Sequence, residues 1–294
     1  MEKDTGDKVK RVAEVITAAD ALLITVGAGM GVDSGLSDFR GTQGFWRAYF
    51  AIAKLGLAFE EMASPAWFKK NPHLAWAFYG HRLHLYRKTT PHQGFNQLFR
   101  IGLAKPHGYF VFTSNVDGQF QRAGFAPERI VECHGSIHHF QCVASCNDEI
   151  WDAYSETVKI DGSSFHALEP LLKCRRCPTL ARPNILMFGD WSWLSHRMET
   201  QQHRFAGWLN GLAQSSAKLA VIELGAGSAI PTVRNNSERV LENIEGTLIR
   251  INPREHDVPS GQIGLPFGAA EGIRVICDCA GNLAGERNHK PKRQ

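Results

Sequence analysis

The sequence lacks any apolar run as long as the ~18–20 residues that a membrane-spanning helix needs. Its opening residues, MEKDTGDKVK, contain no apolar segment of the signal-peptide kind. The acids Glu2, Asp4 and Asp7 in the same stretch argue against a transit peptide. We therefore expect a cytoplasmic protein that has no membrane partner.

A large excess of one charge sign is also absent. The 33 Lys and Arg residues outnumber the 29 Asp and Glu residues by four, and much of this excess lies in the basic tail, residues 286–294. A short basic terminus is most often only solvated, so a nucleic-acid partner is not expected. A mildly basic chain still favours anionic ligands such as a dinucleotide.

The hydrophobic content, 43% of 294 residues, is enough for a sizeable core in one large domain or two. Six apolar runs have the composition of strands that are buried on both faces: 21–26, 109–115, 184–190, 219–227, 246–252 and 273–278. Helical periodicity occurs in 8–19, 92–102, 197–213 and 233–244. This alternation predicts an α/β fold in which helices cover both faces of a parallel sheet.

Two segments interrupt the alternation. Residues 43–90 are rich in aromatic side chains and have a helical pattern, and residues 136–181 are polar and poor in strand-forming runs. We interpret both as insertions that together build a smaller lobe. The sequence thus predicts one domain over 1–294, with a large lobe formed by about 1–42, 91–135 and 182–285.

Four of the seven cysteines form two close pairs, which in a cytoplasmic protein indicate a metal rather than disulfides. They are Cys142, Cys146, Cys174 and Cys177, spaced Cys-x3-Cys and Cys-x2-Cys with 27 residues between the pairs. Four thiolates complete a tetrahedral zinc shell without an open position, so the predicted Zn2+ is structural. Arg175 and Arg176 lie between two of these ligands and would offset their charge. We interpret Cys133, Cys277 and Cys279 as small buried fillers.

A glycine-rich turn, GAGMGVDSG (27–35), follows the first apolar run. Gly27, Gly29 and Gly31 would let the backbone approach an anion closely, as in turns that hold a pyrophosphate. The turn alone leaves open a strand–helix connection with no ligand. A dinucleotide-dependent dehydrogenase would place an acid at a second strand end about 20 residues further on. Residues 47–56 contain no acid and no strand pattern, which disfavours hydride transfer.

Several further motifs occur in one order along the chain. They are GAGMGVDSGLSDFRG (27–41), TSNVD (113–117), CHGS (133–136), the two cysteine pairs, RPNILMFGD (182–190), GAGSAIP (225–231) and INPRE (251–255). In this order they resemble the motifs of sirtuins, NAD-dependent protein-lysine deacylases, over about residues 10–285. The resemblance implies a Rossmann-like NAD-binding lobe with a parallel sheet and a smaller lobe that is helical and binds zinc. It further implies NAD and structural Zn2+ as cofactors, acyl-lysine proteins or peptides as substrates, and nicotinamide and O-acyl-ADP-ribose as products.

The resemblance also implies roles for individual residues. His134 matches the catalytic base, and Asn115 and Asp117 match the polar pair of the nicotinamide pocket, Asn115 at the catalytic centre. Cofactor contacts are implied for Gly27, Ala28, Gly29, Ser34, Asp38, Phe39, Arg40, Ser114, Asn115, Asp117, Gly225, Gly227, Asn252 and Cys279. From the residues alone, Asn115 and Asp117 could instead cap the next helix, and His134 could be an ordinary surface or core histidine. His138 and His139 are interpreted as structural.

The chain departs from the sirtuin pattern at a few positions. Gly31 stands where Ser is usual, Ser37 where Pro is usual, and Ser114 where a Gln contacts the nicotinamide ribose. Ala226 and Gly227 stand where Thr and Ser are usual, so two hydroxyls near phosphate are missing. These changes concern ribose positioning and NAD affinity more than the fold.

Tyr79 and Arg82 form an i, i+3 pair in the helical stretch 72–88. The plainer interpretation is an amphipathic helix with its arginine in water. The pair is also similar to the Tyr-x-x-Arg with which sirtuin desuccinylases bind a succinyl or malonyl carboxylate, and a guanidinium matches that planar anion. We therefore predict acidic acyl groups. Phe188 and Gly189 lie in the segment that, by resemblance, binds the substrate peptide as an added strand.

Four functions are compared on this basis. The leading hypothesis is an NAD-dependent lysine deacylase. The second is an NAD-hydrolysing effector or ADP-ribosyltransferase on the same fold, and the third is a non-catalytic sensor of NAD or ADP-ribose, favoured by the missing hydroxyls. A hydride-transferring dehydrogenase comes last.

Overall fold

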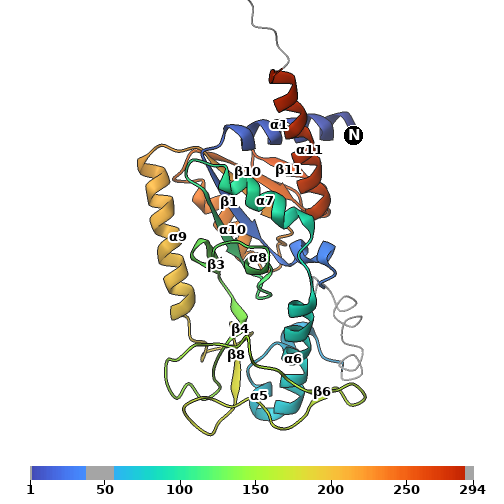
Figure 1. Ribbon diagram of the computed structural model, residues 1–294, viewed down its shortest axis with the longest axis vertical. Helices are drawn as coiled ribbons and strands as arrows, with labels where there is room; N and C mark the ends of the chain where they lie inside the picture. The colour runs from blue at the N-terminus through green and yellow to red at the C-terminus, as the bar shows by residue number, and fades with distance from the viewer. Residues whose placement is uncertain (1, 38–55, 289–294) are drawn as a thin grey trace, which may run out of the picture.

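The structure is a computed structural model, and it describes residues 2–37 and 56–288. Figure 1 shows a sheet-containing large lobe with a second, smaller lobe along the long axis of the molecule. No helix in these described ranges is long and apolar enough to cross a membrane.

The large lobe is built on six parallel strands in the order β11-β10-β9-β1-β2-β3. Their bounds are β1 Ala21–Val26, β2 Tyr109–Thr113, β3 Ile130–Glu132, β9 Leu219–Leu224, β10 Gly246–Ile251 and β11 Ile263–Leu265. Every residue of β1, β2 and β9 is buried, as expected for strands covered on both faces. The predicted α/β fold with a parallel sheet is confirmed.

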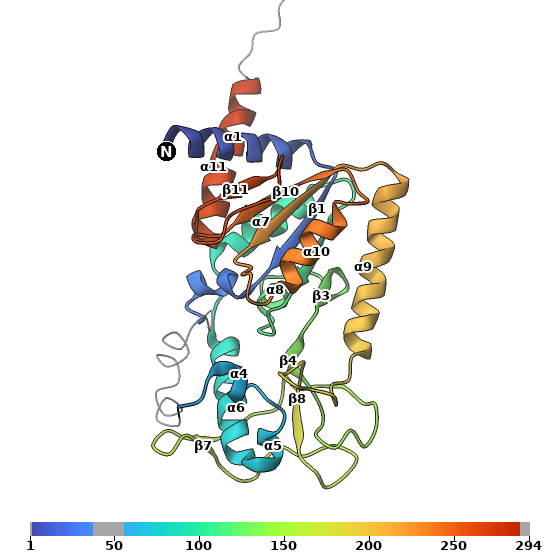
Figure 2. The same ribbon diagram turned by 180° about the vertical axis from the view of Figure 1, so that it is seen from behind.

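Helices cover both faces of this sheet (Figures 1 and 2). One face carries α1 Glu2–Ala18, α7 Gln93–Leu103 and α11 Ala269–Asn288, which share one apolar core with the strands. The other face carries α9 His196–Gln214 and α10 Thr232–Val240 over a second core. Short helical turns connect the strand ends: η1 Ala28–Ser34, α8 Gln119–Arg122 and η2 Pro127–Arg129.

Helix α9 also closes the sheet at its outer strand β3. The side-chain oxygen of Gln201 accepts a hydrogen bond from the backbone N–H of Glu132 at 3.0 Å. The Glu132 carboxylate is buried and paired with Arg197. An open strand edge is a site for aggregation, so the side chains of α9 take the place of a further strand.

The small lobe packs three helices against a small antiparallel sheet. The helices are α4 Phe59–Met62, α5 Trp67–Lys70 and α6 Pro72–Lys88, and the sheet strands are β5 Trp151–Asp152, β4 Gly135–Cys142 and β8 Ala181–Ile185. A two-stranded hairpin adds β6 Ile160–Asp161 and β7 His166–Ala167. Helix α6 begins cleanly because Asn71 accepts a hydrogen bond from the N–H of Leu74 and Pro72 occupies the first turn. The apolar core of the small lobe includes Trp76, Phe78 and Phe140.

Three sequence predictions about elements are wrong. The apolar run 184–190 is not a strand of the parallel sheet: its first two residues end β8, which pairs antiparallel with β4, and the chain then turns through Gly189 at φ +67°. The run 273–278 lies inside α11, where Ile273 and Ile276 are buried one turn apart while Arg274 and Asp278 form an i, i+4 ion pair. The strand-poor segment 136–181 contains most of β4.

Candidate active site at the carboxyl edge of the parallel sheet

The loops that follow β1, β9 and β10 are joined by backbone hydrogen bonds at the carboxyl edge of the sheet. The N–H of Gly29 donates to the carbonyl of Gly225 at 3.1 Å, and the N–H of Gly225 donates to that of Ile251 at 3.1 Å. In parallel sheets this edge is where ligands bind. The predicted phosphate turn therefore lies against the 225–227 loop.

Two glycines of the turn have no room for a side chain. A Cβ on Gly27 would lie 2.7 Å from the carbonyl oxygen of Gly225, and one on Gly29 would lie 2.6 Å from the Cα of Gly225. Gly225 itself has φ +58°. A Cβ on Gly31 would meet only the Leu36 side chain, at 3.2 Å. The lack of side chains at Gly27 and Gly29 thus lets this turn pack directly against the 225–227 loop. The two loops together present backbone at the sheet edge that would hold the pyrophosphate of NAD.

Asn252 is almost completely buried beside this loop. Its side-chain amide donates to the carbonyl of Ala226 at 2.9 Å, and its side-chain oxygen accepts from the N–H of Glu255 at 3.0 Å. Arg234 of α10 donates to the same Ala226 carbonyl at 3.2 Å. Asn252 and Arg234 therefore fix the loop that lacks the two usual hydroxyls.

The segment after β2 reaches the same place. The side-chain amide of Asn115 donates to the carbonyl of Gly27 at 3.1 Å, and the N–H of Ser114 donates to the carbonyl of Val26 at 3.1 Å. Asp117 accepts a hydrogen bond at 2.9 Å from the N–H of Gln119, the first residue of the short helix α8, whose N-cap is Gly118. Burial raises the pKa of Asp117 to about 6, against a hydrogen bond from Gln119 that lowers it.

His134 follows β3 and faces the end of β2. Burial lowers the pKa of its ring, while a hydrogen bond with the backbone of Ser114 acts in the opposite direction. At neutral pH the imidazole is therefore uncharged and able to take up a proton. The backbone continues through Gly135 at φ +79°, where a Cβ would lie 2.1 Å from the carbonyl oxygen of Asn184. The backbone after His134 is therefore in direct contact with β8, which fixes the position of His134 between β2 and β8.

The four paired cysteines gather at one point of the small lobe. Their sulfur atoms all lie within 4.8 Å of one another, with 3.6 Å from Cys142 to Cys177 and 3.7 Å from Cys146 to Cys174. Tetrahedral zinc with bonds of about 2.3 Å requires sulfur atoms about 3.8 Å apart. The donor set therefore fits structural Zn2+.

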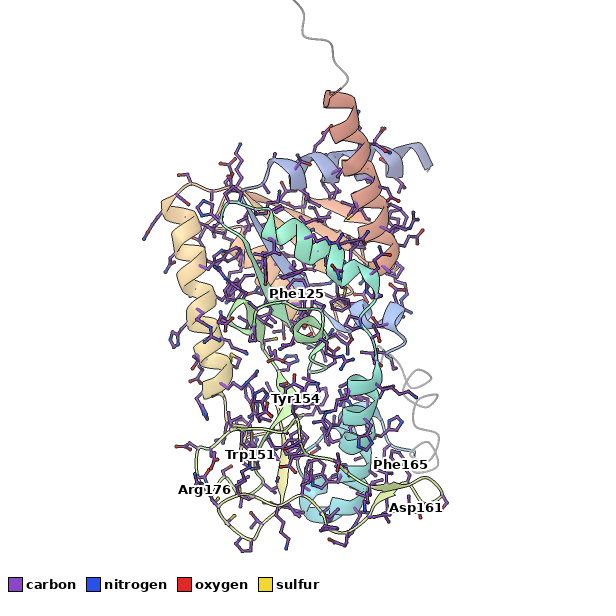
Figure 3. The ribbon with its side chains drawn as sticks, viewed as in Figure 1. Phe125, Trp151, Tyr154, Asp161, Phe165 and Arg176 are labelled. Carbon is purple, nitrogen blue, oxygen red and sulfur yellow. The ribbon has the colours of Figure 1, made fainter. Side chains whose placement is uncertain are left out.

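The two arginines between these cysteines have partners other than sulfur. The Arg176 side chain donates to Glu149 at 2.6 Å, and Arg175 lies over the Trp151 ring at 5.4 Å. Figure 3 shows Arg176 and Trp151 on this side of the small lobe. The pKa of the Arg176 guanidinium is raised by Glu149 and, to a smaller extent, by the nearby Cys174 sulfur, in line with the expected offset of thiolate charge by this residue. The backbone N–H of Arg176 also approaches the Cys174 sulfur at 3.4 Å.

Tyr79 and Arg82 are both buried on α6, with 1% and 6% of their surface exposed, so the alternative that Arg82 lies in water is wrong. The Arg82 guanidinium lies 5.3–5.8 Å from the ring centres of Phe59, Phe78, Tyr79 and Tyr86, and it donates to the Tyr86 hydroxyl at 3.0 Å. Within the described ranges, the buried Tyr79 hydroxyl has no hydrogen-bond partner. Burial raises its pKa, so it stays a neutral donor.

Phe188 and Gly189 lie on the loop that follows β8. The N–H of Phe188 donates to the carbonyl of Ala63 at 3.0 Å, and its ring packs edge-on against Phe59 at 6.2 Å. A groove of about 460 Å³ runs beside it, lined by Glu60, Glu61, Ser64, Ala66, Trp67, Lys70 and Phe188. This loop therefore connects the aromatic surroundings of Arg82 with the surface.

Asp38, Phe39 and Arg40 lie outside the described residues. Cys279 lies in the third turn of α11, within the helix, and Cys133, Cys277 and Cys279 are half-buried rather than fully buried fillers. Ser34 ends the turn η1, and its hydroxyl accepts a hydrogen bond from the N–H of His92 at 2.9 Å.

Sequence reasoning missed two residues that hold the site. His92 donates from Nε2 to the carbonyl of Met30 at 3.1 Å, while its Nδ1 accepts the N–H of Gly94 at 3.1 Å. Arg234 holds the Ala226 carbonyl, as described above. The available signals were weak: His92 is the residue before α7, and Arg234 is in the first turn of α10.

A family model described as the Sir2 family matches residues 27–205, more than half of the chain. The NAD-dependent protein deacylase of Thermococcus kodakarensis is 34% identical over 183 residues, which cover 60% of this chain and 63% of that protein. The protein of the same name from Aquifex aeolicus is 31% identical over 169 residues, covering 58% and 62%. The chain thus spans slightly less than two thirds of the length of these curated relatives.

A solved mutant Sir2 homologue in complex with ADP ribose superposes with a TM-score of 0.65 and 24% identity, over 93% of this chain and 97% of that one. A second solved chain, described as showing the structural basis of sirtuin substrate affinity, has a TM-score of 0.61 and 21% identity over 90% and 96%. At these identities the likeness concerns the fold.

Proposed function

Because this chain belongs to the Sir2 family, we propose that it is an NAD-dependent protein-lysine deacylase, an enzyme that moves the acyl group from lysine to ADP-ribose and releases nicotinamide. The observation that carries the proposal is the meeting of His134, Asn115 and the glycine turn: the His134 ring lies beside the backbone of Ser114, and the side-chain amide of Asn115 donates to the carbonyl of Gly27 at 3.1 Å. A base, a polar pair and a bare phosphate turn are the groups that this chemistry needs.

Each part of the site has a distinct task in this proposal. The backbone at Gly27 and Gly29 binds the pyrophosphate, and the polar groups of Asn115 and Asp117 orient the nicotinamide carboxamide. NAD supplies the leaving group and the ribose carbon at which the acyl oxygen is captured. His134, uncharged at neutral pH because burial lowers its pKa, accepts the proton of a ribose hydroxyl.

Zinc has no part in the reaction. Cys142, Cys146, Cys174 and Cys177 provide four ligands, so a bound Zn2+ has no open position for water or substrate. Its effect is to join β4, which runs into Cys142, to the loop that carries Cys174 and Cys177. The metal therefore stabilises the small lobe.

The acyl group that we propose is acidic, succinyl or malonyl. A buried guanidinium is costly unless an anion or a π-face compensates it. Arg82 has aromatic rings on several sides, and the buried Tyr79 hydroxyl next to it is a donor that a carboxylate could use. A carboxylate bound here would receive a charge-assisted hydrogen bond from each residue.

The substrate peptide would lie extended along 185–190, contacting Phe188 and Gly189. Binding of this kind reads the backbone more than the sequence, so it favours acyl-lysine proteins as a class. A membrane or nucleic-acid partner is not part of the proposal, and the cytoplasmic location stays a prediction.

The test is a panel of lysine peptides carrying acetyl, malonyl, succinyl or longer acyl chains, incubated with NAD and read by mass spectrometry. We expect nicotinamide and O-acyl-ADP-ribose in equal amounts, and their loss in His134→Ala. Nicotinamide release without any acyl peptide would favour the NAD-hydrolysing effector or ADP-ribosyltransferase. Tight NAD binding without turnover of any peptide would favour a sensor, the alternative supported by Ser114, Ala226 and Gly227.

A further inference from the structure

We propose that His138 is a positioning residue that fixes the Asp117 turn of the nicotinamide pocket from the side of the small lobe. The inference rests on the function proposed above, since it assigns Asp117 to that pocket. His138 is on β4, four residues after His134 and four before the zinc ligand Cys142. It lies between the reacting end of the protein and its metal centre.

The His138 ring contacts the Asp117 turn directly. Its Nε2 lies 3.0 Å from the carbonyl oxygen of Asp117, and because a carbonyl only accepts, Nε2 carries the proton. Gly118, the next residue, has φ +71°, and a Cβ there would lie 2.6 Å from the Cδ2 of His138. The turn is therefore held by one hydrogen bond and by direct packing against the imidazole.

The opposite face of the ring is covered by the small lobe. Tyr154 stacks on His138 with ring centres 5.1 Å apart and planes within 3°. The N–H of Ala153 donates to the His138 carbonyl at 2.9 Å, and Arg87 donates to the carbonyls of Ala153 and Glu156 at 2.6 Å each. Figure 3 shows Tyr154 beside β4, between the sheet of the large lobe and the rest of the small lobe.

Packing alone does not account for a histidine at this position. The ring is 3% exposed, and its Nδ1 is buried without a hydrogen-bond partner among the described residues. An unpartnered buried nitrogen is destabilising, and a phenylalanine would fill the space and stack on Tyr154 without that cost. The hydrogen bond to Asp117 is what a histidine adds and a phenylalanine does not.

The segment 115–119 is thus fixed from both lobes. On the large-lobe side, Asn115 is bound to Gly27. On the small-lobe side His138 holds Asp117, and the side chain of Gln119 donates to the carbonyl of Tyr86 on α6 at 3.1 Å. A binding group that is held in place before the ligand arrives loses less freedom on binding. His138 therefore acts on the nicotinamide end of NAD and leaves the ADP-ribose end unaffected.

The experiment compares two substitutions of His138 with one at its neighbour. His138→Phe keeps the stack on Tyr154 and removes the N–H donor, and His138→Gln keeps an N–H donor. His139→Gln is the matched control, because His139 is the neighbouring histidine of β4 and is paired with Asp152 of β5, whereas it is His138 that bonds to the Asp117 carbonyl. NAD and ADP-ribose are titrated separately by calorimetry, so the readout does not depend on turnover.

We expect His138→Phe to weaken NAD binding about fivefold to tenfold, the loss of about one hydrogen bond, and to change ADP-ribose binding less than about twofold. His138→Gln should recover NAD binding to within about threefold of the unchanged protein, and His139→Gln should leave both affinities unchanged. In turnover assays the KM for NAD should rise in His138→Phe while kcat changes little. Zinc content should be the same in every variant.

Equal losses for NAD and ADP-ribose in His138→Phe would overturn the proposal, because they would indicate a general disturbance of the lobe. So would an unchanged NAD affinity, or a Gln variant as weak as the Phe variant. If His138→Phe does not fold, Tyr154→Leu serves instead, since Tyr154 is 56% exposed. In that variant a selective loss of NAD affinity supports the proposal, and an unchanged NAD affinity overturns it. A chain that binds NAD and never deacylates would contradict the proposed function, and the comparison of the two ligands would still decide the role of His138.

Discussion

The side-chain amide of Asn115 donates a hydrogen bond to the carbonyl of Gly27 across 3.1 Å. This contact joins the segment after β2 to the turn after β1, over 88 residues of sequence. Both strands are parallel neighbours in the sheet, so their carboxyl ends are brought together by the ladder itself. The polar group expected at nicotinamide and the backbone expected at phosphate are therefore parts of one rigid arrangement.

Replacing Gly29 by Ala should damage that arrangement. The new Cβ would lie 2.6 Å from the backbone of Gly225, and backbone cannot move aside as a side chain can. We expect NAD binding to weaken at least about tenfold and the free energy of unfolding to fall by about 1–3 kcal/mol. Gly31→Ala is the control, since its Cβ meets the flexible Leu36 side chain at 3.2 Å. Calorimetric NAD titration and urea unfolding check both variants, and equal behaviour of the two would contradict the assignment.

Removal of the metal should loosen the small lobe without touching the phosphate turn. We expect one zinc per chain by atomic emission, its loss in Cys174→Ser, and a melting temperature at least about 5 °C lower. Cys279→Ser is the matched control, because Cys279 lies on α11, outside the cysteine cluster. A full zinc content in Cys174→Ser would refute the four-cysteine site.

The sequence predicts secondary structure best where every residue of a segment is in the same environment, such as a strand buried on both faces. Strands β1 and β9 are buried along their entire length, so their apolar runs predict them directly. Residues 273–278 are apolar for only a few positions, and such a short run does not separate a strand from a helix. This segment is a helix because Ile273 and Ile276 share one buried face, and that face is formed by packing against α1 and α7.

The same reasoning applies to the site. Tyr79 and Arg82 could be paired from their spacing, which is a local property of a helix. The burial of these two side chains could not be predicted from the sequence, because it depends on Phe59 and Phe78, which pack around the guanidinium. His138 contacts Asp117, which lies 21 positions earlier in the sequence, and no pattern in the sequence encodes that contact. The motifs therefore indicate the residues proposed to react, whereas the residues that hold them in place are identified only by their three-dimensional packing.

The proposed preference for acidic acyl groups predicts a selective effect of Arg82→Met. Methionine fills much of the space among the surrounding rings and removes the charge. We expect kcat/KM on a succinyl-lysine peptide to fall at least about a hundredfold, roughly the 3 kcal/mol of a buried charge-assisted pair. Activity on an acetyl-lysine peptide should change less than about threefold. Lys88→Met, an exposed change on the same helix, is the control. Parallel losses on both peptides would remove the basis for the preference.

Replacing Asp117 by Asn should stabilise the protein, and the gain should depend on pH in a defined direction. Burial raises the folded-state pKa of this carboxyl to about 6, from 3.8 in the unfolded chain. The folded state therefore holds the proton more tightly, so this group favours folding below pH 3.8 and loses that contribution as the pH rises through 6. Asparagine has no charge to desolvate and can still accept the N–H of Gln119. We expect a gain of about 3 kcal/mol at pH 8, falling to about half of that at pH 5.

Asp161→Asn should not stabilise the protein at either pH, because hydrogen bonds from Ser163 lower the pKa of that exposed carboxyl. Urea unfolding at the two pH values decides it, and a gain for Asp117→Asn that grows as the pH falls would show that burial is not what raises this pKa.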